Sequence, residues 1–191
     1  MDQPAQSRSE IADQLRPVEV AYLGGGAKAA VMAAVAGLHA RKAVAVLRNR
    51  RLVATGIDPT TRAMAVEYAV LRAVREPTTL GSLRSAAGVR EELRKIDSRL
   101  RTLGLLSSAR RRWLSWLVRR TDAGESVMAE LRRKYEDLDP AKHLAWRPRE
   151  PHRAAMSVAL FGPGAMPPAS SGEGGYGRRT AVDGSADGGA G

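Results

Sequence analysis

The chain has 191 residues, a formal net charge of +11 and no cysteine, which excludes disulfides, thiolate catalysis and cysteine metal sites. Hydrophobic residues make up 43% of it and aromatic residues only 4%, so a packed core must consist mainly of Ala, Leu and Val, and such a core favours helices. Residues 1–10 are polar, unlike a secretory signal, and no run of about 18 apolar residues predicts a conventional transmembrane helix.

These features predict a cytoplasmic, mainly α protein (α+β) with short β-hairpins. The excess of arginine favours polyanionic partners, namely nucleic acid, anionic lipid or an acidic protein face. A GC-rich coding sequence is an alternative source of the arginine bias, but the physical charge is the same in either case.

The first elements are expected before residue 45. Residues 1–15 are expected to form a flexible leader, in which residues 11–15 could start a short turn. Pro17 is well placed to open a helix, because its missing N–H needs no partner in the first turn, and the three glycines at 24–26 should break that helix. A second helix is expected over 27–44, where Ala and Val repeat at helical spacing.

A hairpin is expected next. Val44–Val46 and Leu52–Val53 predict two short strands around a turn at 48–50. Helix, turn, helix and hairpin in this order predict a first winged-helix-like unit over residues 16–57. The Asp-Pro-Thr-Thr sequence at 58–61 marks its boundary, because proline ends the hairpin region and threonine caps helices.

A second winged-helix-like unit is expected over residues 60–139, with longer elements. Its first helix is predicted over 61–74, and a short helix over 80–88 is predicted to end at Gly88. The apolar face of the first of these helices is expected to consist of Met64, Tyr68, Leu71 and Val74.

The longest helix of this unit is predicted over 89–103, with Gly104 as its C-cap. Its apolar stripe is expected to consist of Leu93, Ile96, Leu100 and Leu103. Residues 107–120 are expected to form a hairpin or a short amphipathic helix, and Thr121–Asp122 is a cap pair for a final helix that reaches Leu138.

Residues 140–166 are expected to form a C-terminal extension that packs on the core. Its apolar run at 154–162 predicts a strand or a turn of helix against the second unit. Residues 167–191 are rich in Gly, Ser, Ala and Asp, a composition that buries too little surface to offset the entropy of ordering. We therefore expect a disordered Gly-rich tail.

Three segments resemble an uncharacterised actinobacterial family: RPVEVAYLGGG at 16–26, RTDAGESVMAELRRKYEDLDP at 120–140 and HRAAMSVALFG at 152–162, followed by the Gly-rich tail. The resemblance covers roughly residues 15–166. Many members of that family are regarded as membrane proteins, with hydrophobic segments near this chain's residues 110–120. Here the apolar stretch is too short to span a bilayer, so the resemblance implies a short form without transmembrane segments and a peripheral relation to a membrane.

The second unit also resembles bacterial winged-helix regulators. In those proteins a recognition helix precedes a GLL sequence, a basic wing follows, and a T-x-x-G helix start comes next. The corresponding sequences here are LGLL at 103–106 and TDAG at 121–124. The two-unit pattern is similar, in topology alone, to Golgi phosphoprotein relatives that bind phosphoinositide head groups.

The first candidate contact site is the basic Trp segment, residues 110–120. Its arginines and tryptophans are Arg110, Arg111, Arg112, Trp113, Trp116, Arg119 and Arg120. Trp prefers the membrane interface and flanking Arg attracts anionic lipid, whereas a wing of the same residues could place arginines in a DNA minor groove. The alternative without a binding role is a structural hairpin that buries both tryptophans among solvated arginines.

The helix over 89–103 is the second candidate, as a DNA recognition helix. Its cations are Arg90, Arg94, Lys95, Arg99 and Arg101. Three acidic residues, Glu91, Glu92 and Asp97, interleave with them, and each carboxylate repels phosphate. A solvated charged face, stabilised by pairs at helical spacing, is therefore the competing interpretation.

Sequence signals for chemistry are weak. The glycines and lysine at 24–28 lack the GxxxxGK[ST] spacing of a phosphate loop, so we predict a flexible helix–helix turn there. The histidines, at 39, 143 and 152, show no metal-ligand spacing, and neither G-x-S-x-G nor H-E-x-x-H occurs. We expect no enzymatic activity, no cofactor and no metal.

Together these observations predict a non-enzymatic interaction module that acts at an anionic membrane surface, on the inner face of the membrane, or on a protein partner through the basic Trp segment. The first alternative is a winged-helix DNA-binding transcriptional regulator, with residues 89–103 in the major groove and 109–120 as the wing. The second alternative is a structural adaptor, which could be a homodimer.

Overall fold

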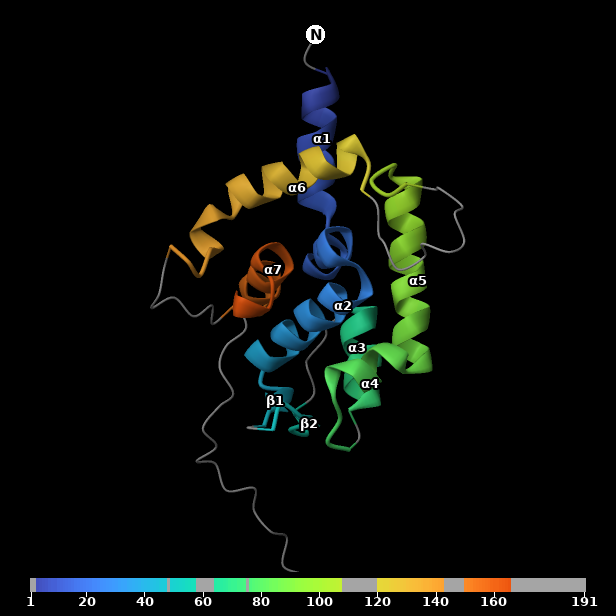
Figure 1. Ribbon diagram of the computed structural model, residues 1–191, viewed down its shortest axis with the longest axis vertical. Helices are drawn as coiled ribbons and strands as arrows, with labels where there is room; N and C mark the ends of the chain where they lie inside the picture. Colours follow the sequence, from blue (N-terminus) through green and yellow to red (C-terminus); the bar gives the residue numbers. More distant parts are fainter. Residues whose placement is uncertain are drawn as a thin grey trace, which may run out of the picture.

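The computed structural model describes residues 3–47, 49–57, 64–74, 76–107, 120–142 and 150–165. In these ranges the chain is mainly helical and has one two-stranded antiparallel sheet (Figure 1), which confirms the mainly α prediction. The predicted tail at 167–191 lies outside the described residues. The elements in chain order are α1 (Gln3–Gln14), α2 (Pro17–Ala40), β1 (Val44–Val46), β2 (Leu52–Ala54), α3 (Ala65–Ala73), α4 (Leu80–Ser85), α5 (Ala87–Thr102), α6 (Asp122–Lys134), the 3-10 turn Glu136–Leu138, α7 (Pro151–Phe161) and the 3-10 turn Pro163–Ala165.

Helix α2 is the centre of the fold. It runs through the middle of the molecule, with α7 along one side and α3 and α5 on the other (Figure 1). Pro17 is its first residue, as its fixed φ and absent N–H favour. The predicted break is present as a kink, where Gly25 and Gly26 have non-helical dihedrals. Gly26 has a φ of 68°, a left-handed value that glycine adopts without steric strain.

Helix α7 packs along α2 through small side chains. An ideal Cβ on Gly24 of α2 would lie 3.5 Å from the carbonyl oxygen of Ala159 in α7. An ideal Cβ on Gly37 would lie 3.6 Å from the Cβ of Ala155, also in α7. Only small residues allow two helix backbones to approach so closely at the packing density of a protein interior.

The predicted strand or turn of helix at 154–162 is therefore corrected in part. This run forms most of α7, a helix of three turns, and its main neighbour is α2 rather than the second unit. Pro151 begins the helix and Gly162, with a φ of 82°, ends it. The small side chains of the run match the Ala- and Gly-rich surface of α2, and no sheet edge offers it a comparable partner among the described residues.

Residues 3–14 form α1, whereas the sequence predicts a flexible leader over 1–15. Ala12 and Leu15 are buried, α1 packs on α6, and Asp13 forms an ion pair with Lys134 of α6. A helix this short is marginal in isolation. Its stability comes from contacts with α6, about 120 residues later in the chain, which local composition does not reveal.

The predicted hairpin is confirmed. Strands β1 and β2 pair in antiparallel register, with Val44 opposite Ala54 and Val46 opposite Leu52. Leu52 also forms an antiparallel bridge with Thr78. The N–H of Leu52 donates to the carbonyl of Thr78 at 2.8 Å, and the N–H of Thr78 donates to the carbonyl of Leu52 at 3.0 Å. The hairpin of the first half is thereby joined to the segment that precedes α4.

Helix α3 has the predicted apolar face in part. Val74 is buried and Met64 and Leu71 pack against the core, whereas Tyr68 is 38% exposed. Val66 and Val70 are also buried, and Glu67 between them forms an ion pair of 2.7 Å with Arg41.

Helix α5 has the predicted apolar stripe. Its buried residues are Val89, Leu93, Ile96 and Leu100. Gly104 follows with a φ of 70°, the left-handed C-cap conformation that was predicted. Gly88 was predicted to end the short helix. It lies instead in the first turn of α5, because the extended Ala86 already separates the two helices.

Helix α2 also meets the length and composition criteria of a membrane-spanning helix, alone among the helices of the described ranges. It has 24 residues, and 67% of its most apolar window is buried by the rest of the chain. The glycine kink and the buried Glu19 lie within it. A helix that is apolar on all sides and covered on all sides is also the ordinary core helix of a folded domain.

A substitution at Gly37 tests the close packing around α2. An ideal Cβ on Gly37 would lie 2.5 Å from Oε1 of Glu67, and Arg41 holds that carboxylate in place. We expect Gly37→Ala to lower the free energy of unfolding by about 1–3 kcal/mol, the usual range for overpacking, in urea denaturation. Gly88→Ala is the matched control, because nothing lies within 4 Å of its ideal Cβ, and it should raise the free energy of unfolding by about 0.5–1 kcal/mol. Equal effects would contradict the packing at Gly37.

Candidate functional site

The basic Trp segment lies outside the described residues except for Arg120, but both of its flanks are described. Leu106 and Arg120 form an antiparallel bridge. The N–H of Thr121 donates to the carbonyl of Leu105 at 3.1 Å, and its hydroxyl donates to the carbonyl of Gly104 at 2.6 Å. The chain therefore leaves and re-enters the described fold at one place.

The first turn of α6 packs tightly against this flank. Thr121 is the predicted N-cap, and its Oγ1 accepts from the N–H of Gly124 at 3.1 Å. An ideal Cβ on Gly124 would lie 2.3 Å from the carbonyl oxygen of Leu105, so only glycine fits there. Arg120 itself pairs with Glu125 at 2.7 Å.

The five cations predicted for a recognition helix all lie on α5, and four of them contact a carboxylate. Three pairs lie within α5: Arg94 with Glu91 at 3.3 Å, Lys95 with Glu92 at 2.7 Å, and Arg101 with Asp97 at 2.6 Å. The hydrogen bonds to Glu92 and to Asp97 raise the pKa of Lys95 and of Arg101, respectively.

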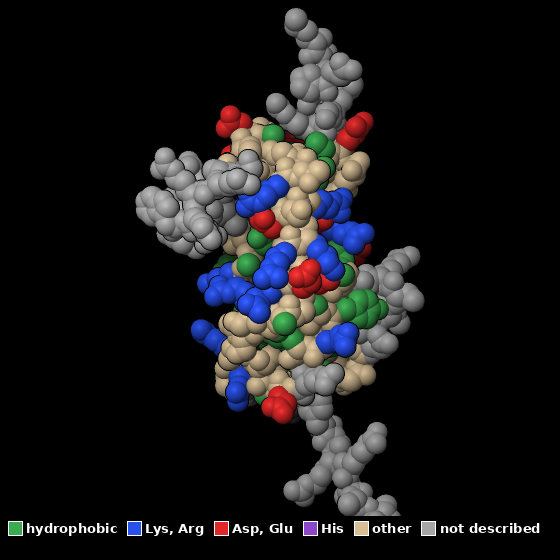
Figure 2. Space-filling view, turned by 90° about the vertical axis from the view of Figure 1, so that its right-hand side faces the viewer, with side chains coloured by type: hydrophobic (Ala, Val, Ile, Leu, Met, Phe, Trp, Pro, Cys, Tyr) green, Lys and Arg blue, Asp and Glu red, His purple; other side chains and the backbone are tan. Residues whose placement is uncertain are grey.

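The fourth pair joins two helices, since Arg99 contacts Glu19 of α2 at 2.9 Å. Arg90 is exposed and forms no ion pair with any described residue. Figure 2 shows this side of the molecule, where Lys and Arg side chains gather with acidic side chains among them. Interleaved carboxylates give this surface the character of a solvated charged face more than that of an acid-free DNA-reading face.

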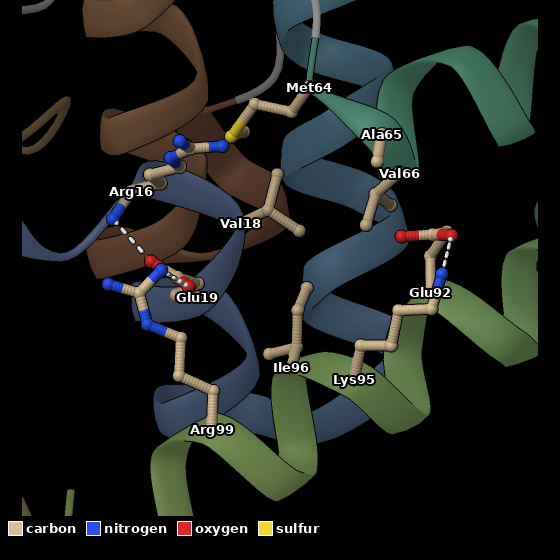
Figure 3. Close-up of a pocket in the computed structure, with 10 residues that line it drawn as sticks. All are labelled: Arg16, Val18, Glu19, Met64, Ala65, Val66, Glu92, Lys95, Ile96 and Arg99. Carbon is tan, nitrogen blue, oxygen red and sulfur yellow. Dashed lines mark hydrogen bonds and ion pairs between the residues drawn. The ribbon is translucent and has the colours of Figure 1, made fainter.

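A cleft of about 180 Å³ opens beside α5. The starts of α2 and α3 and the middle of α5 form it (Figure 3). Its walls combine apolar side chains with three cations and two carboxylates. The lining residues are Arg16, Val18, Glu19, Met64, Ala65, Val66, Glu92, Lys95, Ile96 and Arg99.

The orientation of the charged groups is visible in Figure 3. Arg99 reaches across to Glu19, and Lys95 folds back onto Glu92. Arg16 and Met64 both line the cleft, from the starts of α2 and α3 (Figure 3). Arg16 forms no ion pair within the part of the chain that the structure describes.

Two buried glutamates occupy matching places in the two halves of the fold. Glu19 and Glu67 are each the third residue of a helix, and each accepts a 2.8 Å hydrogen bond from the N–H of the N-cap residue. The other oxygen of each carboxylate contacts an arginine from elsewhere, Arg99 or Arg41. The prediction missed both residues, although a glutamate three residues after a helix start is a recognised capping signal.

A polar chain connects α2 to the flank of the basic Trp segment. The hydroxyl of Tyr22 donates to Asp97 at 3.3 Å, Arg101 donates to both oxygens of the same carboxylate, and Nη1 of Arg101 donates to the carbonyl of Ser107. Burial of the phenol and the negative charge of Asp97 raise the pKa of Tyr22 to about 12.

Two further sequence candidates have structural explanations, and His143 lies outside the described residues. Within residues 24–28, Gly25 and Gly26 form a kink between the two parts of α2, at the place predicted for a helix–helix turn. The ring of His39 is within 3.0 Å of the carbonyl of Val44. Within the described ranges, no group of three His, Asp or Glu residues could hold a metal ion.

Comparison with known proteins adds no relative: no family model, no curated protein and no solved structure matches the chain at a significant level. Inference about function therefore rests on the residues and their geometry.

The raised pKa of Tyr22 provides a test by pH. The folded-state pKa of about 12 lies above the ordinary value of 10.0, so the stability that neutral Tyr22 contributes is fully present below pH 10 and is lost as the pH rises through about 12. We expect tyrosinate absorbance to show a step near pH 12 that Tyr22→Phe removes. Tyr68→Phe, at an exposed position, should leave this step in place, and a step that survives Tyr22→Phe would contradict the contact with Asp97.

Proposed function

We propose that the protein is a non-enzymatic interaction module that binds an anionic membrane surface through the basic Trp segment. The observation that carries the proposal is the joining of the segment's flanks. Leu106 pairs with Arg120, and Thr121 holds the carbonyl of Gly104. A short segment whose ends are fixed side by side on a folded body loses less entropy on binding than a free chain does.

The composition of the segment suits a lipid surface. Residues 108–120 contain five arginines and no acidic residue. Each arginine near an anionic surface contributes about 1 kcal/mol; because Arg120 is engaged with Glu125, the other four contribute about 4 kcal/mol before screening by salt. Trp113 and Trp116 prefer the boundary between water and lipid. Charge and interfacial tryptophans together support reversible peripheral binding.

The order of the described elements supports a scaffold of two winged-helix-like units. In the second half, α3, the Thr78 bridge, α4, α5 and the bridge between Leu106 and Arg120 follow one another. The first half contains the two parts of α2 and then the β1–β2 hairpin. The matching roles of Glu19 and Glu67 add a second correspondence between the halves. In this proposal the basic Trp segment is the wing of the second unit.

The inner face of the cytoplasmic membrane is the proposed location. Its anionic lipids supply the negative surface potential that a basic segment needs. The resemblance to an actinobacterial family with many membrane proteins points to the same surface. The long apolar α2 is occupied as the core helix of the described fold, which leaves the basic Trp segment as the proposed membrane contact.

A winged-helix DNA-binding regulator is the second candidate. The same order of elements favours it, with α5 in the major groove and the basic Trp segment as the wing. The carboxylates among the cations of α5 weigh against it, because Glu91, Glu92 and Asp97 would repel the DNA phosphates along this helix. A structural adaptor, alone or as a homodimer, is the third candidate. The exposed Tyr68 and Ile57 give it little support, because isolated apolar residues on a surface are ordinary.

Co-sedimentation with phosphatidylglycerol vesicles tests the membrane proposal. Because a buried aromatic side chain contributes about 1.5–3 kcal/mol, we expect Trp113→Ala and Trp116→Ala each to weaken vesicle binding by about tenfold or more. Trp146→Ala is the matched control, because Trp146 is the third tryptophan of the chain and lies outside the segment. This variant should bind vesicles as the unsubstituted protein does.

Excess duplex DNA separates the candidates in the same assay. Vesicle binding that resists DNA and depends on Trp113 and Trp116 supports the membrane proposal. Binding that DNA abolishes, with no effect of the tryptophans, would mean that charge alone acts and would favour the DNA-binding candidate. An absence of vesicle binding would overturn the membrane proposal and favour the adaptor.

A further inference from the structure

The cleft between α2, α3 and α5 has a composition that the basic Trp segment does not explain. We propose that this cleft binds the head of an amphipathic monoanion, that is, a singly charged oxyanion carrying a short apolar chain. The site is separate from the basic Trp segment and goes beyond the proposed function, because none of its lining residues lies within 108–120.

The charges of the lining set the charge of the ligand. Arg16, Lys95 and Arg99 bring three positive charges, and Glu19 and Glu92 bring two negative ones. One net positive charge remains, so a single negative charge neutralises the cleft, whereas a dianion would leave an excess in a partly enclosed space.

The three cations of the cleft have N–H donors available for a ligand. Arg16 forms no ion pair with any described residue. Arg99 contacts Glu19 through one of its guanidinium nitrogens, and a guanidinium has five N–H donors. In the bond between Lys95 and Glu92 of one helix, the Lys95 side chain is 62% exposed and that of Glu92 is 20% exposed, and an ion pair open to solvent on the lysine side is weak enough to exchange for a ligand.

Glu19 has no carboxylate oxygen left unbonded. Both oxygens of Glu19 are already bonded, one to the N–H of Arg16 and the other to Arg99. The helix starts are not the site themselves, because the N-cap N–H groups at Arg16 and Met64 are bonded to Glu19 and Glu67. The proposal therefore rests on the side chains around the cleft.

The rest of the wall is apolar, which calls for a carbon chain beside the charged head. Val18, Met64, Ala65, Val66 and Ile96 supply it. The cleft holds about 180 Å³, slightly more than the cavity of about 150 Å³ that accommodates benzene. It is smaller than the pockets of about 300–1,000 Å³ that enclose drug-sized ligands, so the buried part of the ligand is short.

Two probes carry this chemistry from different sources. Hexanoate represents a soluble carboxylate, and dihexanoyl phosphatidylglycerol, used below its micelle concentration, represents the phosphodiester of an anionic lipid. Dihexanoyl phosphatidylcholine has the same chains without net charge and serves as the ligand control. Binding is followed by NMR shifts of the Arg16 and Arg99 guanidinium N–H and of the Ala65 amide. The full chain is used throughout.

Two variants test the site against a control with the same charge change. We expect Arg16→Gln to weaken binding about tenfold, the effect of one charge-assisted hydrogen bond, whereas Arg90→Gln should have no effect, because Arg90 is an exposed arginine of α5 outside the cleft. Ala65→Leu keeps the charge and fills the exposed wall position, so it should abolish binding. The amide spectrum of each variant checks that it is folded.

The outcomes are decisive in both directions. Saturable shifts with either anion, lost in Ala65→Leu and kept in Arg90→Gln, support the proposal, and the anion that binds more tightly identifies the source. An absence of shifts, equal binding of phosphatidylcholine, or equal losses in Arg16→Gln and Arg90→Gln would overturn it. The double variant Trp113→Ala/Trp116→Ala should keep the shifts with hexanoate, so failure of the membrane proposal and failure of the cleft proposal are distinguishable.

Discussion

The carboxylate of Glu67 joins the start of α3 to the end of α2. Its Oε2 accepts from the N–H of Met64 at the start of α3, and its Oε1 contacts Arg41 at the end of α2. Gly37 of α2 leaves the room that this carboxylate occupies, and Ala155 of α7 lies on the same spot. A buried charge is tolerated only where it is paired and hydrogen-bonded, and loss of one partner typically costs about 3–5 kcal/mol. The packing of α3 on the end of α2 therefore includes a paired, hydrogen-bonded buried charge.

Glu19 performs the corresponding task at the other end of α2. Its contact with Arg99 holds the last turn of α5 against the start of α2, and the kink at Gly25 and Gly26 allows the two parts of α2 to take different directions. The cleft is the space left where these helix starts meet α5 (Figure 3). Its ligand chemistry thus follows from the same ion pair that builds the fold, and substitutions of Glu19 or Arg99 would disturb both.

The basic Trp segment is connected to this framework by polar contacts. Asp97 accepts from Tyr22 of α2 and from Arg101, and Arg101 reaches the carbonyl of Ser107 at the segment's flank. On the other flank, Thr121 caps α6 and bonds Gly104. The described flanks of the segment are therefore held side by side next to α5 and α6, which is the physical basis of the proposal that the segment is presented for binding.

Local sequence determined the helical class, the glycine kink in α2, the β1–β2 hairpin, the apolar stripe of α5 and the cap of α6, because turn residues, caps and periodicity act within a few residues. Only the tertiary structure decided that α1 is a helix on α6, that α7 lies on α2, and that α3 turns Tyr68 outward. For the candidate sites, the sequence identified the cations of α5 and the acidic residues among them but not Glu19, the partner of Arg99 on α2, and it gave no sign of the cleft. Ion pairs such as Arg41 with Glu67 and Arg99 with Glu19 join residues far apart in the chain, and such contacts depend on how whole helices pack rather than on any local pattern.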